Sequence, residues 1–266
     1  MNIKKIGHIE TIGFTATAPG TSGAAAAAVA GDSLVIKNGK SPVIMGLACD
    51  FQGAGFAQVV FPTGHDTTRG MRQPVAAGEP TPRIPVGVAL PITAQETMAV
   101  TVAGSATAGD VENGILLIGY EEMPGSQQNL IKWSACMKRM VKFTTVYATL
   151  AVGTGGTWSG EEALNADSDL LIANREYALL GMEFLNECAA VSIKGPDTAG
   201  VRIAVPGSVE FADLSMNYFA AMSRAFGDET LIPVINSANK SNTLLQVLGD
   251  ENGGTVTVAL QLCLLD

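Results

Sequence analysis

The fold is decided by the stretch Asp32-Ser-Leu-Val-Ile-Lys-Asn-Gly-Lys-Ser-Pro-Val-Ile-Met-Gly46, because a weaker copy of it occurs about half a chain later. The copy is Ser168-Asp-Leu-Leu-Ile-Ala-Asn-Arg-Glu-Tyr-Ala-Leu-Leu-Gly181. Three pairs of residues match at a constant offset of 136: Leu34 with Leu170, Ile36 with Ile172, and Asn38 with Asn174. A repeat of this length indicates that the chain is built from two related halves.

Each copy is typical of a β-hairpin. In the first copy, apolar residues alternate with less apolar neighbours around Leu34 and Ile36, and residues 43–47 form the returning strand. Asn38-Gly39 between them can supply the two positive-φ residues of a type I′ turn. In the second copy Arg175 replaces the glycine, so only the asparagine keeps an easy left-handed conformation. We therefore expect the strands in both copies and the type I′ turn only in the first.

The duplication extends to both ends of each half. Lys4-Lys5-Ile6 matches Lys138-Arg139-Met140, and each is followed by an apolar segment and a glycine-rich loop. At the other end, the polar turns Gly109-Asp-Val-Glu-Asn-Gly114 and Gly249-Asp-Glu-Asn-Gly-Gly254 each precede a last apolar strand. Three matches in the same order predict a tandem duplication with about eight strands in each half.

The repeat divides the 266 residues into a first domain, 1–125, a linker, 126–137, and a second domain, 138–266. The linker is expected to hold a short helix over 127–137, capped by Ser126. The first half contains a long proline-rich loop at 63–85. The second half contains an insertion over 208–226, whose apolar residues recur at spacings of three and four and predict an amphipathic helix.

The first strand is expected within residues 3–18. Its inward candidates are Ile6, Ile9, Ile12 and Phe14, and they change face once. A change of face within one strand is typical of a β-bulge, which we place near Gly13.

The composition suggests that much of the surface is buried against other molecules. Hydrophobic residues make up 47% of the chain and charged residues only 15%, with a mean hydropathy of +0.27. Ordinary soluble domains carry about 25% charged residues, so this chain has little charge with which to cover a free monomer. The net charge of −9 argues against a sequence-specific nucleic-acid binder, because phosphate contacts need clustered lysine and arginine.

The residues needed for common enzyme and metal sites are scarce. The two histidines, His8 and His65, lie in a strand-like segment and a loop, and no Gly-x-Ser-x-Gly motif exists. The four cysteines form no Cys-x-x-Cys motif and are expected to be buried thiols. The acidic turn residues Asp110 and Glu112 lack calcium-loop spacing and are expected to form turns. We therefore predict no enzymatic activity and no small-molecule substrate, and we assign no catalytic, cofactor-binding or metal residue.

The chain also lacks an apparent secretion signal or a membrane-spanning run. After Met1-Asn-Ile-Lys-Lys, apolar and polar residues alternate, and the longest run of small apolar residues, 24–30, is far shorter than a span. We expect a soluble chain, with the basic residues near its N-terminus able to lie against an anionic surface.

The two tandem β-rich halves, the short linker, the long loop in one half and the helical insertion in the other together resemble the double jelly-roll major capsid proteins. These are the adenovirus hexon-like coats of tailless icosahedral bacteriophages and related viruses. The resemblance covers the whole chain. It implies an all-β fold of two tandem jelly-roll β-sandwiches with a helical insertion in the second half.

The resemblance also implies a function and a set of partners. It implies a homotrimer that forms a pseudo-hexagonal tile and joins neighbouring capsid trimers and other minor capsid proteins in an icosahedral shell. The N-terminus would face an internal membrane or the genome. The protein would be made in the host cytoplasm and reside in the virion.

The alternative is a tandem β-sandwich module that binds carbohydrate or a receptor on a phage or cell surface. Sugar sites usually use exposed aromatic side chains, and the best candidate is Trp158 in the loop 153–160. A clean monomer in solution would favour this alternative over a capsid protein.

Overall fold

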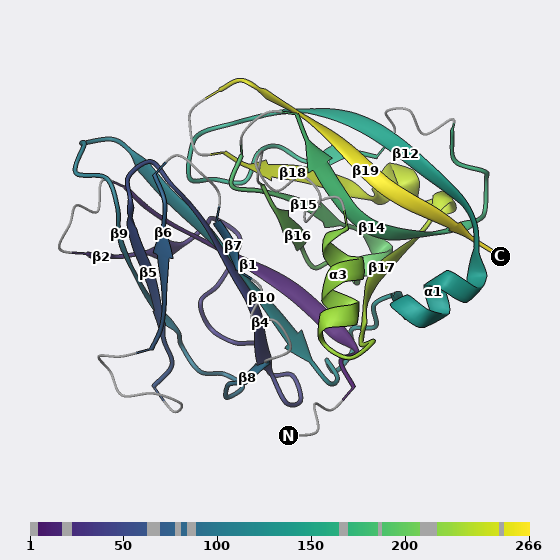
Figure 1. Ribbon diagram of the computed structural model, residues 1–266, viewed down its shortest axis with the longest axis horizontal. Helices are drawn as coiled ribbons and strands as arrows, with labels where there is room; N and C mark the ends of the chain where they lie inside the picture. Colours follow the sequence, from purple (N-terminus) through teal and green to yellow (C-terminus); the bar gives the residue numbers. More distant parts are fainter. Residues whose placement is uncertain are drawn as a thin grey trace.

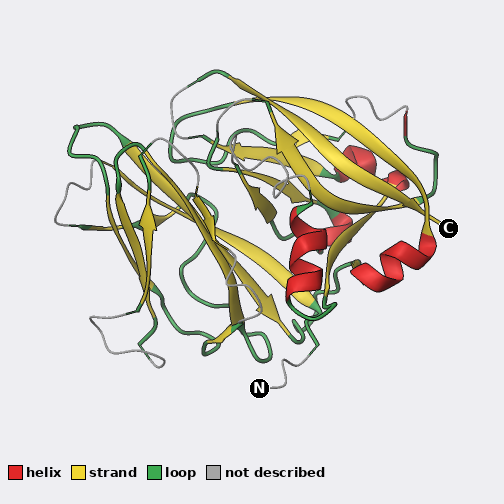
Figure 2. Ribbon diagram, in the orientation of Figure 1, coloured by secondary structure: helices red, strands yellow, loops and turns green. Residues whose placement is uncertain are grey.

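The computed structural model describes residues 5–17, 23–62, 70–77, 81–83, 89–164, 170–185, 188–207, 217–249 and 253–266. Several sequence predictions concern residues outside these ranges: Lys4, His65, much of the loop 63–85, the first part of the helical insertion (208–216) and the acidic residues of the second polar turn (250–252). Within the described ranges the chain forms two β-sandwiches that lie side by side (Figure 1). Among the described residues, strands predominate and the helices lie in the second half (Figure 2).

The first half forms two antiparallel sheets. One has the strand order β3-β1-β10-β4-β7, with β8 also paired to β4, and the other has the order β2-β9-β5-β6. The strands are β1 (His8–Thr17), β2 (Ala24–Ala25), β3 (Ala27–Ala28), β4 (Val43–Phe51), β5 (Gly55–Val60), β6 (Met71–Val75), β7 (Thr81–Arg83), β8 (Leu90–Pro91), β9 (Ala99–Ala103) and β10 (Val111–Tyr120).

The second half repeats this arrangement, with sheet orders β11-β17-β14-β19-β12 and β13-β18-β15-β16. The strands are β11 (Leu130–Lys132), β12 (Met140–Ala151), β13 (Glu162–Ala163), β14 (Glu176–Phe184), β15 (Ala190–Lys194), β16 (Ile203–Pro206), β17 (Thr230–Asn236), β18 (Leu244–Leu248) and β19 (Thr255–Leu265). The helices are α1 (Trp133–Arg139) and α3 (Tyr218–Ala225), with the 3₁₀ helices η2 (Pro196–Thr198) and η3 (Ser237–Asn242).

Both halves have the topology of a jelly roll, in which two Greek keys wind one chain through two facing sheets. The first long strand of each half pairs with the last, β1 with β10 and β12 with β19. The last strand then pairs with β4 or β14, and the second sheets have matching orders, whereas β3 beside β1 occurs only in the first half and β11 beside β17 only in the second. The predicted fold class, two tandem jelly-roll β-sandwiches with a helical insertion in the second, is therefore confirmed. We call the two sandwiches roll 1 and roll 2.

The predicted hairpin between residues 34 and 46 is wrong. The segment around Val35 pairs with Thr97, and Ile36 N donates a 2.9 Å hydrogen bond to Glu96 O. The predicted return strand does exist, as the start of β4, but it pairs with β10, β7 and β8. Residues 34–36 therefore belong to a loop of roll 1 that runs beside residues 95–98.

Gly39 is a glycine for a different reason from the one predicted. Among the described residues, neither Asn38 nor Gly39 has a positive φ, so no type I′ turn forms there. A Cβ on Gly39 would lie 2.3 Å from Cδ1 of Tyr120. The glycine is required because the loop passes directly over this buried ring.

The second copy differs in a similar way. Residues 170–173, predicted as a strand, are not in a strand, while the return strand is β14. Asn174 has φ 56°, as the left-handed preference of asparagine predicts. The hydroxyl of Tyr177 accepts a 2.7 Å hydrogen bond from Ile172 N. In both halves the repeated motif thus supplies one strand and a loop, not two paired strands.

The change of face in the first strand needs no bulge. β1 pairs with β10 in unbroken register from His8 to Thr17, so the bulge predicted near Gly13 is absent. Ile12 and Phe14 pack in the core of roll 1, whereas Ile9 packs in the cluster that fills roll 2. Both faces of β1 are buried, and the apolar pattern changes face because each face meets a different core.

The linker and the insertion are only partly as predicted. Residues 130–132 form β11 and the helix begins at Trp133, without a side-chain cap, rather than at residue 127. In the insertion, α3 packs on β14 and β17, and its Tyr218, Phe219 and Met222 are buried. The described part of the predicted aromatic stripe therefore belongs to the core. No helix in the described residues is both long and apolar enough to cross a membrane.

Candidate functional site

Among the described residues, the titratable side chains form no group typical of a metal centre. No cluster of three or more histidine, cysteine, aspartate or glutamate side chains among them could hold a metal ion. His8 is buried beside Tyr120, with ring centroids 5.8 Å apart, and burial lowers its pKa to about 4. The four cysteines are free and buried. The features with functional potential are instead surfaces.

The acidic residue Glu112 and its neighbour Asn113 lie at the start of β10, not in the turn that precedes it. The carboxylate of Glu112 accepts a 2.6 Å hydrogen bond from Ser105 N, and Asn113 Nδ2 donates a 2.9 Å hydrogen bond to Gly249 O. Glu112 and Asn113 are both fully buried. Both residues bond to backbone groups from within the strand, so the prediction that Glu112 forms a turn is wrong, whereas Asp110 closes the turn 107–110 with a 3.4 Å hydrogen bond from its N to Thr107 O.

Within the described ranges, an extensive contact joins the two rolls, and we call it the junction. The outer face of the sheet that contains β1, β10 and β4 packs on the outer face of β15, β16 and β18. We use "outer" for side chains that point away from a roll's own core. The junction cluster comprises Val29, Ala48, Ile115, Trp158, Ala189, Ala190, Ala204 and Leu248. Small side chains on roll 2 allow its sheet to approach β1 closely.

Hydrogen bonds that involve backbone groups join roll 1 to the second half of the chain across this junction. Thr11 N donates to Arg202 O at 2.9 Å, and Ala204 N donates to the Thr11 hydroxyl at 2.8 Å. Next to them, Ile9 N donates to Gln128 Oε1 at 2.8 Å, and Gln128 Nε2 donates to Ile9 O at 2.7 Å. Buried polar groups in a junction are costly unless paired, and these are paired.

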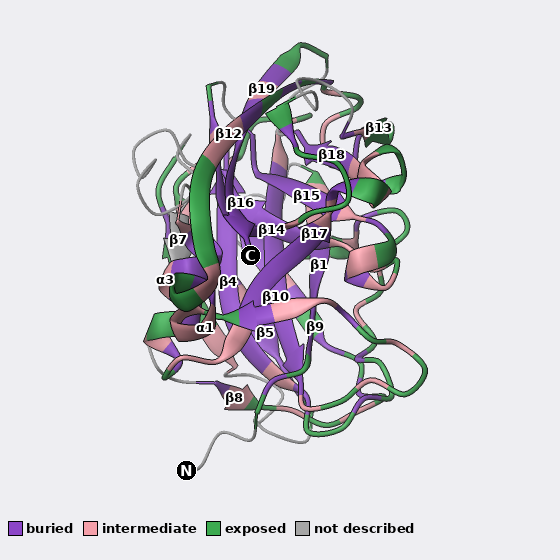
Figure 3. Ribbon diagram, turned by 90° about the vertical axis from the view of Figure 1, so that its right-hand side faces the viewer, coloured by how far each residue is buried: buried purple, intermediate pink, exposed green. Residues whose placement is uncertain are grey.

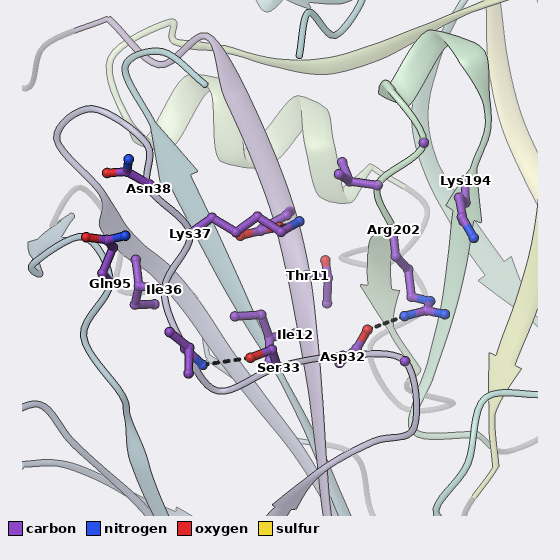
Figure 4. A pocket seen from close by; sticks show the side chains of 15 residues that line it. Thr11, Ile12, Asp32, Ser33, Ile36, Lys37, Asn38, Gln95, Lys194 and Arg202 are labelled. Carbon is purple, nitrogen blue, oxygen red and sulfur yellow. Dashed lines mark hydrogen bonds and ion pairs between the residues drawn. The ribbon is translucent and has the colours of Figure 1, made fainter. Parts of the chain in front are cut away.

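A buried ion pair closes the junction at one side. The Asp32 carboxylate of roll 1 pairs with Arg202 of roll 2 (Figure 4). It also accepts hydrogen bonds from Gly13 N at 2.7 Å and from Trp158 Nε1 at 3.0 Å. The Arg202 guanidinium lies 4.5 Å from the Trp158 ring centroid and donates to Gln246 Oε1 at 3.0 Å. Burial raises the pKa of Asp32, and the nearby Arg202 opposes that rise. We call Asp32, Arg202 and Trp158 the latch.

The latch accounts for Trp158, the residue that the sequence offered as a sugar-binding candidate. Its side chain is buried, its indole N–H is bonded to Asp32, and Arg202 covers its ring. It therefore presents no free aromatic face, and the strongest sequence argument for a carbohydrate-binding module does not hold. In the sequence, Trp158 directly follows the glycine-rich segment 153–157, which matches residues 19–23 of the first half. This place in the repeat is the signal that could have identified its role.

A cleft of about 520 Å³ opens beside the latch, between the loop 31–38 and residues 200–202 (Figure 4). Each of its basic side chains already has an acidic partner. Lys37 pairs with Glu10, Lys194 Nζ lies 3.1 Å from Glu161 Oε1, and Arg202 pairs with Asp32. The cleft thus offers no uncompensated charge for an ionic ligand.

The second surface of interest is an exposed apolar strip along β12. This strand is the last in its sheet, and its inner residues Val146, Ala148 and Leu150 are buried. The strip comprises Met137, Met140, Val141, Phe143 and Tyr147, all exposed. Phe143 and Tyr147 are 50% and 47% exposed, which is high for aromatic side chains. Figure 3 shows most of the β12 ribbon as exposed, in contrast to the buried strands behind it.

The third surface is the outer face of the second sheet of roll 1, which we call the β5 face. It comprises Phe56, Gln58, Arg72, Pro74 and Thr101, which are half-buried or exposed. The Arg72 guanidinium lies 3.6 Å from the Phe56 ring centroid. Gln58 lies opposite Thr101 on β9 and Arg72 on β6, just as Ser192 in roll 2 lies opposite Gln246 and Ala204.

Comparison with known proteins gives only distant likenesses. No protein-family model and no curated protein sequence matches this chain. Among solved structures, the PBSX exported protein XepA is 10% identical over 96% of this chain and 86% of that one, with a TM-score of 0.28. The major capsid protein P2 from bacteriophage PM2 is 9% identical over 97% of this chain and 98% of that one, with a TM-score of 0.25. A structure of Sulfolobus Turreted Icosahedral Virus is 9% identical over 97% of this chain and 80% of that one, also with a TM-score of 0.25. Because these TM-scores lie below 0.5, we base the proposed function on the surfaces of the molecule itself.

Proposed function

We propose that this protein is a structural subunit of a viral shell, a major capsid protein that self-assembles as trimers. Three chains would place six jelly rolls in a pseudo-hexagonal tile, and tiles would join in an icosahedral shell. The observation that carries the proposal is the junction. Two jelly rolls are joined face to face into one building block, while the equivalent faces at its two ends remain exposed.

The composition and the exposed residues support this role. A chain with 15% charged residues and an exposed apolar strip on an edge strand has surface that association would bury. Symmetric assembly of identical subunits is the commonest way to bury such surface.

The proposal extends to partners and location. The protein would contact neighbouring trimers and other minor capsid proteins, and it would reside in the virion after synthesis in the host cytoplasm. Its N-terminal end would face an internal membrane or the genome, which the exposed Lys5 supports. No observation favours the alternative of a carbohydrate-binding module, because Trp158 is buried in the latch.

The first experiment is the mass of the purified chain in solution, measured by light scattering on a sizing column. One chain has a mass of 27.4 kDa. We expect a trimer or larger particles, with regular shells in electron micrographs of concentrated samples. A chain that remains a monomer at every concentration tested would refute the proposal. Detection of the protein as the main component of purified virions would establish its location.

A further inference from the structure

The internal repeat indicates which surfaces join one copy to the next. Resting on the proposed function, we infer that the β12 strip of one chain docks on the β5 face of a second copy, in a contact that repeats the junction between roll 1 and roll 2 but lacks its ion-paired latch. The second copy is the only occupant for which the molecule itself supplies a template. Each step of the inference compares an exposed residue with its buried counterpart.

The first step compares β12 with β1. At the offset of 134 that aligns Lys4 with Lys138, the outer residues Ile9 and Thr11 of β1 correspond to Phe143 and Thr145 of β12. In roll 1 these positions are fully buried against roll 2, and Thr11 bonds to β16. In roll 2 Phe143 is exposed, and the Thr145 hydroxyl donates to Gln261 Oε1 of its own sheet at 2.9 Å. The strip is therefore the same face of a jelly roll, left without a partner.

The second step compares the β5 face with its counterpart in roll 2. The residues Ser192, Ala204 and Gln246 of roll 2 are buried under β1. The residues at the matching crossing of the roll 1 sheet, Gln58, Arg72 and Thr101, include none that is fully buried. Roll 1 thus presents to solvent the kind of sheet face that roll 2 uses in the junction. One chain carries both halves of a head-to-tail contact, which closes into a ring when the rotation allows.

The third step concerns the chemistry of the contact. Arg202 lies two residues before Ala204, and the position two residues before Arg72 is Gly70. The β5 face therefore lacks the arginine of the latch. On the other side, the strip offers aromatic and aliphatic side chains where β1 has smaller residues such as Gly13. The contact between chains should depend on apolar burial, and so should persist at high salt.

A lipid surface fits the strip less well than a second copy. Basic residues flank it: Arg139 is paired with both Glu176 and Asp266, and Lys132 lies near Asp228, while Lys138 and Lys142 are exposed. Two such lysines are fewer than the cluster of about 4–8 lysine and arginine residues that is typical of segments binding anionic lipid, so a second copy, for which the junction supplies a template, is the better-supported occupant. Binding to vesicles that contain anionic lipid, with no self-association, would favour the membrane instead.

The experiment uses two variants that each block one face. Tyr147→Asp puts a charge on the strip and leaves the β5 face intact, whereas Thr101→Arg adds bulk and charge to the β5 face and leaves the strip intact. Each variant alone should sediment as a monomer, while wild type forms trimers or larger species. An equimolar mixture should form a heterodimer and nothing larger, because one intact strip can meet one intact face. A head-to-tail contact predicts this result, and a contact between two identical faces does not.

Val35→Asp is the matched control. The exposed fraction of Val35, 44%, is similar to the 47% of Tyr147, but Val35 lines the cleft within one chain. This variant should assemble as wild type does, and wild-type assembly should be unchanged between low and high salt. Unchanged assembly of Tyr147→Asp, or a mixture that stays monomeric over the full concentration series, would overturn the inference. The proposed function would survive those outcomes, since it fails only if wild type never associates.

Discussion

The strands β1 and β12 are the same strand of two jelly rolls, yet their surroundings are opposite. Each pairs with the last strand of its roll, β1 with β10 and β12 with β19. β1 also pairs with β3 at its second edge and packs under roll 2, so most of it is buried. β12 ends its sheet and exposes Phe143 and Tyr147. The topology repeats, but the role of the strand does not.

The difference teaches that a duplicated chain uses one surface twice. The covalent link supplies roll 2 to roll 1 as a partner at high effective concentration, so that contact forms within the molecule. The equivalent surface of roll 2 must find its partner in another molecule. The side chains follow this division: small residues and a polar latch lie under β1, and larger apolar residues lie on β12.

Loss of the latch should have the largest effect on the isolated chain. Asp32→Ala leaves Arg202 buried without its counter-charge, and it leaves the N–H groups of Gly13 and Trp158 without an acceptor. Breaking a buried pair in this way costs about 3–5 kcal/mol. The free energy of unfolding from urea denaturation should fall by that amount. The control is Glu161→Ala, which removes the partner of the more exposed Lys194 and should cost less than about 1 kcal/mol; equal losses would mean that the latch does not hold the junction.

The next largest difference in the free energy of unfolding is expected when matched residues of β1 and β12 are truncated. Ile9→Ala creates a cavity between the rolls and should lower the free energy of unfolding by about 2–5 kcal/mol. Phe143→Ala, at the corresponding position of β12, should change it by no more than about 0.5 kcal/mol in dilute solution. Urea denaturation of both variants at low protein concentration measures the difference. Similar losses for the two would show that β12 is covered within one chain.

The sequence was sufficient to predict the long strands but not which segments pair with the loops between them. The repeat and the alternation of apolar residues place β1, β10 and their counterparts in roll 2 correctly, because period-two patterns fix which residues face a core. The hairpin failed because Asn38-Gly39 resembles a turn, whereas the glycine is there to clear Tyr120. Local patterns do not reveal that the segment 34–36 pairs with a segment some sixty residues away.

The junction could not be predicted from sequence for a related reason. Asp32 and Arg202 are separated by 170 residues, and nothing local to either indicates a buried ion pair. The apparent change of face in β1 did carry information, since it reflects two cores on the two sides of one strand. A strand with apolar residues on both faces in one half, matched to an alternating strand in the other, is a pattern that could have located the junction.

Acid should weaken β1 through His8, for which β12 has no counterpart, since Lys142 takes that position. Burial lowers the pKa of His8 from 6.5 to about 4, so the native state holds it neutral while the unfolded state binds a proton. The stabilisation is therefore complete above pH 6.5 and is lost as the pH falls from 6.5 through 4. The loss should approach about 3 kcal/mol below pH 4. Urea denaturation of wild type and His8→Gln from pH 7.5 to 4 measures it; parallel curves for the two proteins would contradict the assignment.

The smallest effect on the free energy of unfolding is expected at Gly13 of β1, whose counterpart on β12 is the much larger Tyr147. A Cβ on Gly13 would lie 3.0 Å from Asp32 Oδ2, 3.1 Å from Val29 Cγ2 and 3.3 Å from Trp158 Nε1. Gly13→Ala should therefore crowd the latch and lower the free energy of unfolding by about 1–3 kcal/mol, whereas Tyr147→Ala, at the corresponding position of β12, should change it by about 0.5 kcal/mol or less. The assembled mass should respond in the opposite order, falling for Tyr147→Ala and holding for Gly13→Ala. Such a reversal, measured by urea denaturation and light scattering on the same two variants, would separate the surface that holds one chain together from the surface that joins it to the next.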